Sequence, residues 1–333
     1  MSEELSIYYE QDADLNLLKG KTIAILGYGS QGRPQALNLR DSGLNVIVGQ
    51  RLGSVHYENA IKDGFKPTSI VEAVKKADWI QMMLPDEKQK DIWEKDILPN
   101  LKEGAIVSFA HGFNITFKQI IPPKNIDVVM ISPKGVGPKV RIQYLNDYGV
   151  PCLIAIEQNV SGKAKDLALA YAKGIGGTRV GVLETTFKEE TESDLFGEQV
   201  VLCGGVIELI TAAFDTLVQN GFKPEMAYFE CFYELKLLTD LLFEKGISQT
   251  NLAISDTAEY GEYVSGKKII TDDTKKAMKE ILDKIRSGEF AKNWIAETKA
   301  GKPYLLKARQ AIAQRKIELV GNNLRKILRK EQG

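Results

Sequence analysis

Two patterns of apolar positions divide this sequence. In the first half, short apolar runs rich in β-branched residues alternate with segments of helical periodicity. Such alternation predicts a largely parallel sheet with helices on both faces. The predicted strands are residues 22–26, 46–49, 79–84, 106–109, 128–132, 153–156 and 179–182. The predicted helices between them include residues 35–42, 69–76 and 163–173, and Ser69 with Glu72 fits a capping box.

The second pattern begins after Val182, where the strand signal stops and apolar residues recur at spacings of three and four. This periodicity indicates helices. We therefore expect an α/β protein with a Rossmann-like, doubly wound parallel sheet in residues 1–185 and an all-α domain in residues 186–333. Gly204 and Gly205 lie inside a helical run, which suggests that two helices approach closely there.

Composition narrows the classes of function. The 333 residues include 44 basic and 44 acidic side chains, so no net charge favours nucleic acid or an anionic membrane. The three cysteines lie in apolar runs, and we expect buried thiols in a reducing compartment. The first residues are acidic and polar, unlike a signal or transit peptide, and no apolar run looks long enough to cross a bilayer. We expect a cytoplasmic protein without a nucleic-acid or membrane partner.

A glycine motif joins the first predicted strand to the helix after it. It consists of Gly27, Tyr28, Gly29, Ser30, Gln31 and Gly32. In this position the first glycine makes a tight turn, the second admits a pyrophosphate, and the third lets helix and strand pack. The helix N-terminus attracts the phosphate charge. The motif predicts a dinucleotide site.

The loop after the second predicted strand bears on the choice of dinucleotide. An acid is expected there if the ribose carries free hydroxyls. The sequence instead has Arg51 and Ser54, a cation and a hydroxyl donor that suit a 2′-phosphate. This favours NADPH as the cofactor, with NADH as the alternative.

Two pairs of acids, each four residues apart on a predicted helix, indicate a metal. They are Asp194 with Glu198, and Glu230 with Glu234. Residues four apart share one helical face, and the second pair interrupts an otherwise apolar stripe. Four carboxylates directed at an interior require a positive charge among them, and oxygen donors suit Mg²⁺.

Other readings of these residues are less specific. Acidic residues at helical spacing usually form a solvated face, which suits Glu189, Glu190 and Glu192 but fits Glu230 poorly. His111 follows a predicted strand at the sheet edge where ligands bind, although a lone histidine is more often structural. Lys134 follows the next strand and either faces the site or lies on the surface.

Six segments resemble a known family, the ketol-acid reductoisomerases of branched-chain amino acid synthesis, in their short form. They are GYGSQG, LPDEKQ, FAHGFNI, TTFKEETESDLFGEQ, PEMAYFECFYELK and ISDTAEYG, in the family's order. The resemblance implies a knotted all-α second domain and an enzyme with two Mg²⁺ ions. Enzymes of this family catalyse the migration of an alkyl group between adjacent carbons of 2-acetolactate or 2-aceto-2-hydroxybutyrate. They then use NADPH to reduce the resulting 2-keto acid to a 2,3-dihydroxy acid.

The resemblance also assigns residues. Asp194 and Glu198 match the first pair of metal ligands, and Glu230 and Glu234 match the second. His111 matches an active-site histidine. Ser255 matches a serine that contacts substrate, although it could instead cap the helix that begins near Thr257. The family's loop beside the nicotinamide is matched here by Asp86, Glu87, Lys88 and Gln89. Gly137 belongs to the SPKGVG loop, which would lie near the same ring. The family forms homodimers with shared sites, so Glu230, Glu234 and Ser255 would come from a neighbouring chain.

Two segments depart from the family pattern. Val136 stands where proline is usual, which should loosen that loop, and Arg33-Pro34-Gln35 replaces a stretch that usually contains histidine. Two competing hypotheses remain: a divergent paralogue that serves as a binding or structural subunit, and a reductase of 2-keto acids without isomerase activity. The sequence leaves open the preferred acetohydroxy acid, the strength of the NADPH preference and any assembly beyond a dimer.

Overall fold

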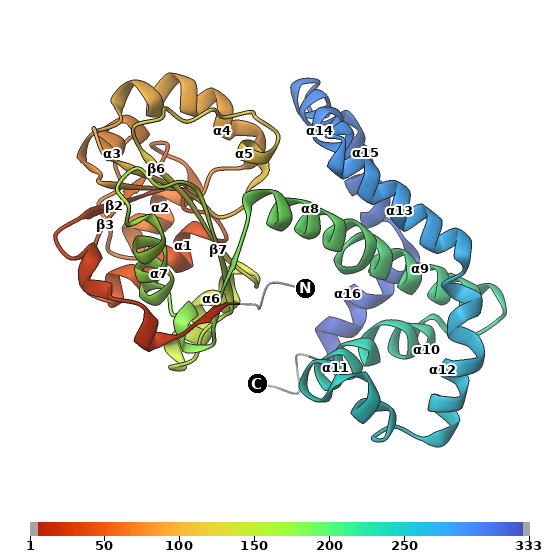
Figure 1. Cartoon of the computed structure of the whole chain (residues 1–333). Coiled ribbons are helices and arrows are strands. Elements are labelled where there is room, and N and C mark those ends of the chain that lie inside the picture. Colours follow the sequence, from red (N-terminus) through yellow and green to blue (C-terminus); the bar gives the residue numbers. More distant parts are fainter. Residues whose placement is uncertain (1–5, 329–333) are drawn as a thin grey trace. The chain divides into compact units, whose positions relative to one another are not determined.

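The computed structural model describes residues 6–328 (Figure 1). The chain folds as two units, Met1–Ser193 and Asp194–Gly333, here called the N-terminal and C-terminal units. The division falls inside helix α8 (Phe187–Gly197). The domain boundary predicted from the sequence, between residues 185 and 186, lies just before this helix.

An eight-stranded sheet forms the centre of the N-terminal unit, in the order β1-β8-β7-β6-β5-β4-β2-β3. Neighbouring strands from β3 across to β6 pair in parallel, whereas β7 is antiparallel to β6 and β1 is antiparallel to β8. The strands are β1 (Ile7–Tyr8), β2 (Thr22–Leu26), β3 (Asn45–Gly49), β4 (Trp79–Met82), β5 (Ile106–Phe109), β6 (Asp127–Pro133), β7 (Cys152–Gln158) and β8 (Val182–Thr185).

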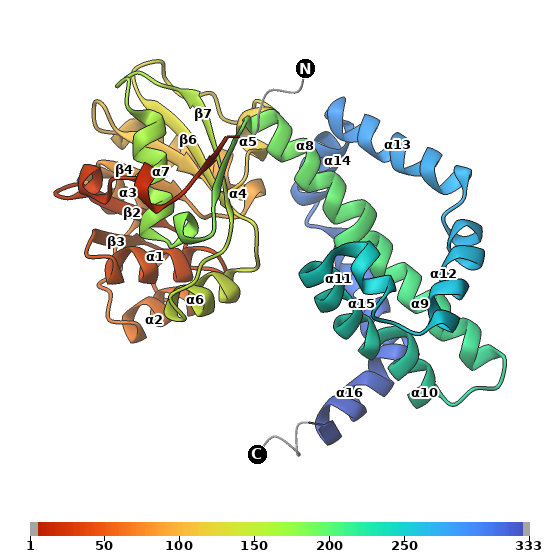
Figure 2. The same cartoon turned by 60° about the horizontal axis from the view of Figure 1, so that its bottom comes forward.

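Helices cover both faces of this sheet, which confirms the doubly wound fold (Figure 2). They are α1 (Gly32–Asp41), α2 (Val55–Lys62), α3 (Ile70–Lys76), α4 (Asp86–Ile92), α5 (Phe113–Thr116), α6 (Gly137–Leu145) and α7 (Ala164–Gly174). Alternate side chains of β2 enter different apolar clusters: Ile23 packs with α1 and α7, and Ala24 packs with α3. The capping box is confirmed, since the amide of Glu72 donates to Ser69 Oγ at 3.2 Å.

One predicted strand is wrong. The predicted strand at residues 179–182 lies mostly in a turn, because Gly177–Arg179 form a 3₁₀ helix and β8 begins only at Val182. Gly176 and Gly181, with φ of +90° and +146°, hold the chain in conformations that favour glycine on either side of this turn.

The described part of the C-terminal unit consists of helices and their connections. Beyond α8 they are α9 (Gly204–Gln219), α10 (Pro224–Tyr228), α11 (Glu234–Asn251), α12 (Asp256–Ile269), α13 (Asp272–Arg286), α14 (Glu289–Lys299), α15 (Pro303–Ala313) and α16 (Lys316–Leu328). Ile210 and Phe214 of α9 pack with Ala227 and Tyr228 of α10 and with Ile317 of α16. This all-helical half confirms the second predicted pattern.

Two expectations from composition are wrong. The helical stretch Phe187–Gln219 is long and apolar enough to cross a membrane, and 11% of its most apolar part is buried in the chain. One such helix is weak evidence of a span, because helices of soluble proteins meet the same criterion. Cys203 is exposed and Cys231 is half-buried, so of the three thiols only Cys152 is fully buried.

Candidate active site

The glycine motif forms the connection between β2 and α1 that a dinucleotide requires. Gly27 has a φ of +100°, and a Cβ there would lie 2.6 Å from the carbonyl oxygen of Met83. A Cβ on Gly32 would lie 2.0 Å from the carbonyl oxygen of Gly27. No atom lies within 4 Å of the Cβ position of Gly29. The first and third glycines are thus fixed by the fold, and the second faces open space where a phosphate can approach.

A network of side chains braces the loop after β3. Gln50 accepts a hydrogen bond from the amide of Tyr28 at 3.3 Å, and its Nε2 donates to Ser54 Oγ at 3.1 Å. Ser54 is the N-cap of α2 and also accepts from the amide of Tyr57. Arg51 is exposed and lines a cleft of about 600 Å³ beside this loop. The two residues predicted to contact a 2′-phosphate therefore lie on one loop, next to the glycine motif.

The predicted loop beside the nicotinamide is the first turn of α4. It contains Asp86, Glu87, Lys88 and Gln89. Asn114, buried in α5, donates from Nδ2 to the carbonyl oxygen of Asp86 and to Gln89 Oε1, both at 3.0 Å. Gln89 Nε2 in turn donates to the carbonyl oxygen of Leu84 at 2.8 Å. Asn114 was not singled out from the sequence, and it holds this turn in place.

The loop before α6 lies directly against the glycine motif. A Cβ on Gly137 would lie 1.7 Å from the carbonyl oxygen of Ser30, so only glycine fits. Gln31 Nε2 donates to the carbonyl oxygen of Gly135 at 2.8 Å. Val136 has a φ of −61°, the value that proline would impose, so the departure at this position keeps a proline-like backbone.

The other departure joins two helices. Arg33, in the first turn of α1, forms a bidentate ion pair with Asp63 at the end of α2, with nitrogen–oxygen distances of 2.7 and 2.9 Å. The Tyr28 hydroxyl donates to the same carboxylate at 2.8 Å. The bond from Arg33 holds the pKa of the Asp63 carboxyl below its usual range despite partial burial.

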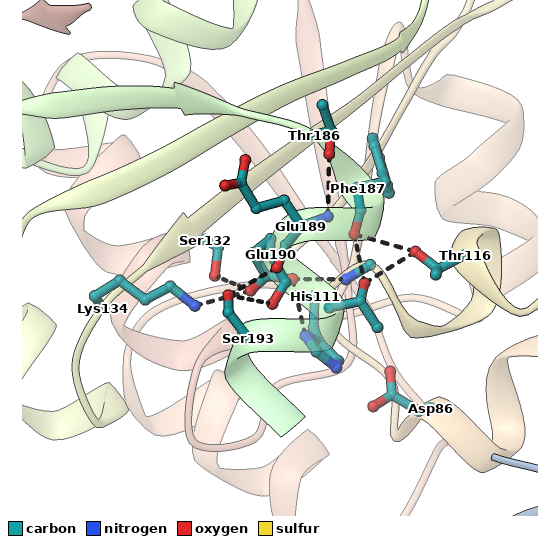
Figure 3. A network of polar contacts seen from close by, with 12 residues as sticks. Asp86, His111, Thr116, Ser132, Lys134, Thr186, Phe187, Glu189, Glu190 and Ser193 are labelled. Carbon is teal, nitrogen blue, oxygen red and sulfur yellow. Dashed lines mark hydrogen bonds and ion pairs between the residues drawn. The ribbon is translucent and has the colours of Figure 1, made fainter. Parts of the chain in front are cut away.

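Glu190 lies at the centre of the polar site (Figure 3). Its Oε1 accepts from Ser132 Oγ and from Lys134 Nζ, each at 2.9 Å. Its Oε2 accepts from the amide of Gly112 at 3.2 Å and lies 3.1 Å from His111 Nδ1. One carboxylate thus joins the ends of β5 and β6 to the first turn of α8. His111 and Lys134, both predicted as site residues, are brought together by it.

The environment of Glu190 keeps it ionised. Burial alone would raise the pKa of this carboxyl, but the hydrogen bond and charge of His111, together with those of Lys134, lower it to about 2. The expectation of a solvated acidic face is wrong for Glu190, which is 1% exposed, and for Glu192, which is 9% exposed. Glu189 is exposed as expected.

Close packing fixes the turn that carries Glu190. A Cβ on Gly112 would lie 2.3 Å from Thr191 Oγ1 and 2.8 Å from the carbonyl oxygen of Phe187. Thr116 Oγ1 also donates to the Phe187 carbonyl oxygen at 3.1 Å, as does Thr191 Oγ1 at 2.6 Å (Figure 3). The start of α8 is therefore held against residues 111–116.

The first predicted metal pair continues the same helical face. Asp194 follows Glu190 by four residues in α8, and one ligand atom each from His111, Glu190 and Asp194 lies within 4.8 Å of the others. Within residues 6–328 no second group of three such side chains meets this criterion. Glu198 follows one turn later and is exposed. Carboxylate oxygens of this kind suit Mg²⁺, which typically takes one or two carboxylates and completes its shell with water or substrate.

The second predicted metal pair lies elsewhere in the chain. Glu230 and Glu234 are exposed, and neither belongs to the group of potential ligands around Glu190. The apolar stripe beside them is not an interior within one chain, because Leu237 is 55% and Leu238 39% exposed. The argument that this pair is buried therefore fails for a single chain.

Ser255 is the N-cap of α12, and its Oγ accepts from the amide of Ala258 at 3.2 Å. The capping interpretation of this serine is confirmed. Ser255 is an exposed residue of the C-terminal unit, and its contact with substrate stays a prediction.

Two family models together match nearly the whole chain. The acetohydroxy acid isomeroreductase NADPH-binding domain matches residues 17–181, and the ketol-acid reductoisomerase C-terminal domain matches residues 187–330. A solved NADH-preferring ketol-acid reductoisomerase from an uncultured archean is 46% identical, with a TM-score of 0.94 over 96% of this chain and 98% of that chain.

Two more distant structures share the fold. A semialdehyde dehydrogenase NAD-binding protein from Cupriavidus necator is 21% identical, with a TM-score of 0.60 over 80% of this chain and 99% of that chain. A pyrroline carboxylate reductase from Plasmodium falciparum is 16% identical, with a TM-score of 0.51 over 81% and 98%. With both halves matched by the same family, and with a close relative over almost its full length, this chain belongs to the ketol-acid reductoisomerase family.

Proposed function

We propose that this chain acts with two Mg²⁺ ions and NADPH on 2-acetolactate or 2-aceto-2-hydroxybutyrate. It first moves an alkyl group between adjacent carbons and then reduces the new ketone, which gives a 2,3-dihydroxy acid for branched-chain amino acid synthesis. The observation that carries this proposal is the buried Glu190, which contacts His111 and Lys134 at the end of the sheet and groups with His111 and Asp194 as potential metal ligands.

The site residues suit the two steps. When bound, the metal ions would polarise the substrate ketone and acidify its hydroxyl. Glu190 keeps a negative charge that orients the ammonium of Lys134 and the ring of His111. Removal of the hydroxyl proton starts the alkyl shift, and a proton must reach the new alkoxide after hydride addition. Lys134 and His111 are the polar groups placed to move those protons.

A second copy of the chain would complete the site. We propose a homodimer in which Glu230, Glu234 and Ser255 of one chain reach the Asp194 pair of the other. Large apolar side chains that remain exposed in the single chain support this, since they need a covering surface. They include Leu202, Phe243, Leu252 and Tyr304, which are 68–91% exposed. We also propose that this dimer works in the cytoplasm, with no nucleic-acid or membrane partner.

Turnover tests the reaction. The purified chain should oxidise NADPH with 2-acetolactate only when Mg²⁺ is present. The same assay with 3-hydroxy-3-methyl-2-ketobutyrate isolates the reduction step. Activity on this ketone alone would limit the protein to a reductase, and tight NADPH binding without turnover of either compound would indicate a binding subunit.

The preferred cofactor is either NADPH or NADH. Arg51 and Ser54 favour NADPH, whereas the relative at 46% identity is NADH-preferring. We expect Arg51→Asp to lower kcat/KM for NADPH by about 10- to 100-fold, the value of a lost charged hydrogen bond, and to leave that for NADH nearly unchanged. Lys124→Asp, the same charge change at an exposed loop position, is the control. An equal loss with both cofactors would contradict a contact between Arg51 and the 2′-phosphate.

A further inference from the structure

The long helix Phe187–Gln219 does not keep one period throughout. Between α8 and α9, residues Glu198–Leu202 form a π-turn, and the amide of Cys203 donates to the carbonyl oxygen of Glu198, five residues earlier, at 2.9 Å. A π-turn lets a helix take up one extra residue, and such turns are frequent at functional sites. This one begins at the second acid of the predicted metal pair.

Gly204 and Gly205 are what permits this turn. A Cβ on Gly204 would lie 2.0 Å from the carbonyl oxygen of Gln199, and a Cβ on Gly205 would lie 1.9 Å from that of Val200. Both obstacles are backbone atoms of the same helix, so a side chain at either position forces the turn to change. Within the described residues no atom of another helix lies within 4 Å of the Cβ position of Gly205, so at this glycine the expected approach of two helices is not found in one chain.

Packing within the C-terminal unit fixes the helix that follows the turn. On its C-terminal side, Ile210 and Phe214 hold α9 against Ala227 and Tyr228 of α10. The second acid pair follows directly, since the next π-turn, Phe229–Tyr233, contains Glu230 and is followed by Glu234. The direction of the first acid pair relative to the second therefore depends on the turn after Glu198.

An extra residue in a helix changes the direction in which all later side chains point. One residue added to a regular α-helix turns everything beyond it by about 100°. The π-turn absorbs such a residue locally, so that the faces before and after it keep their relation. A third π-turn, Trp93–Ile97, carries no predicted ligand, so a wide turn alone does not indicate a role in metal binding.

We propose that Gly204 and Gly205 are positioning residues for the metal ligands. By leaving room for the carbonyl oxygens of residues 199 and 200, they set the direction of Asp194 and Glu198 relative to the face of α9 that packs against α10, the helix that precedes the second acid pair. This inference rests on the proposed function, because it takes these acids to be the ligands.

The test measures Mn²⁺ binding to the full-length protein by electron paramagnetic resonance, with Mn²⁺ as the probe for the Mg²⁺ sites. Gly204→Ala with Gly205→Ala should raise the Kd for Mn²⁺ by about tenfold or more, since misplacing ligands by an ångström removes much of their effect. NADPH binding, a property of the N-terminal unit, should stay unchanged. Gly197→Ala is the matched control, because no atom lies within 4 Å of its Cβ position.

A shortened chain separates positioning from general disruption. Deleting Leu202 from the double-alanine variant removes the residue that the π-turn absorbs, and a regular helix that accepts alanine should restore the Kd for Mn²⁺. Unchanged binding in the double-alanine variant would overturn the proposal, and so would failure of the shortened chain to fold or to bind Mn²⁺. If the wild-type chain itself binds no Mn²⁺, the proposed function fails instead. In that case the Tm tests the role of the two glycines: deleting Leu202 should recover the Tm that the double-alanine variant lost.

Discussion

Glu190→Gln should lower kcat by about 10²- to 10⁴-fold, the usual range for a group that controls proton transfer. The amide keeps the shape of the side chain but removes the charge that orients Lys134 and the His111 ring, at 2.9 and 3.1 Å. Steady-state rates with 2-acetolactate, NADPH and saturating Mg²⁺ give the measurement. Activity close to that of the wild-type protein would show that the centre of this site is not the reaction site.

The same variant should change how stability responds to acid. The pKa of Glu190 is lowered from 4.5 to about 2, so its contribution to the free energy of unfolding is complete above about pH 5 and disappears as the pH falls toward 2. That contribution is about 3 kcal/mol. Without divalent ions, the difference in unfolding free energy between the wild-type protein and Glu190→Gln should therefore shrink by this amount from neutral pH to pH 2.

Glu189→Gln is the matched control for both measurements. It makes the same chemical change one residue earlier, at an exposed position whose carboxylate accepts a hydrogen bond from Thr185 Oγ1. Its effect on stability should stay within about 0.5 kcal/mol at any pH, and its rate should match that of the wild-type protein.

Mixing two inactive variants should restore activity if the site is shared between chains. Asp194→Asn and Glu230→Gln should each be inactive alone. In a mixed dimer, one site contains both changed residues and the other contains neither. Random pairing of equal amounts makes half of the dimers mixed, so the mixture should regain about a quarter of wild-type activity.

The choice of partner variant makes this test specific. Asp194→Asn mixed with Glu190→Gln should regain nothing, because both residues lie on α8 of the same chain and every site keeps one defect. Recovery in this control would point to exchange or contamination. Failure of the first mixture to recover, with mixed dimers demonstrated by mass spectrometry, would place all four metal ligands in one chain.

Local pattern predicted much of the N-terminal unit. The predicted strands at residues 22–26 and 106–109 coincide with β2 and β5, because each is a short apolar run with a clear start and end. The antiparallel direction of β7 was missed, since periodicity carries no information about strand direction. The strand at residues 179–182 was misplaced because glycines on both sides set the turn.

The centre of the site could not be predicted in the same way. Glu190 lies in the segment KEETES, which has the composition of a solvated helix. Its partners Ser132 and Lys134 come from β6 and the loop after it, 58 and 56 residues earlier in the chain. Only the assembled sheet brings them to this carboxylate. By contrast, His111 was found from its place after a strand, a local signal that the fold preserves.

The close packing around Gly112 limits which residues can replace it during evolution. Shrinking Thr191 would not make room for a side chain at position 112, since the backbone oxygen of Phe187 still lies 2.8 Å from the Cβ position. A mutational scan should find a single tolerated residue there. New substrate preferences in descendants of this protein must then arise from substitutions at other residues of the site, while position 112 stays glycine.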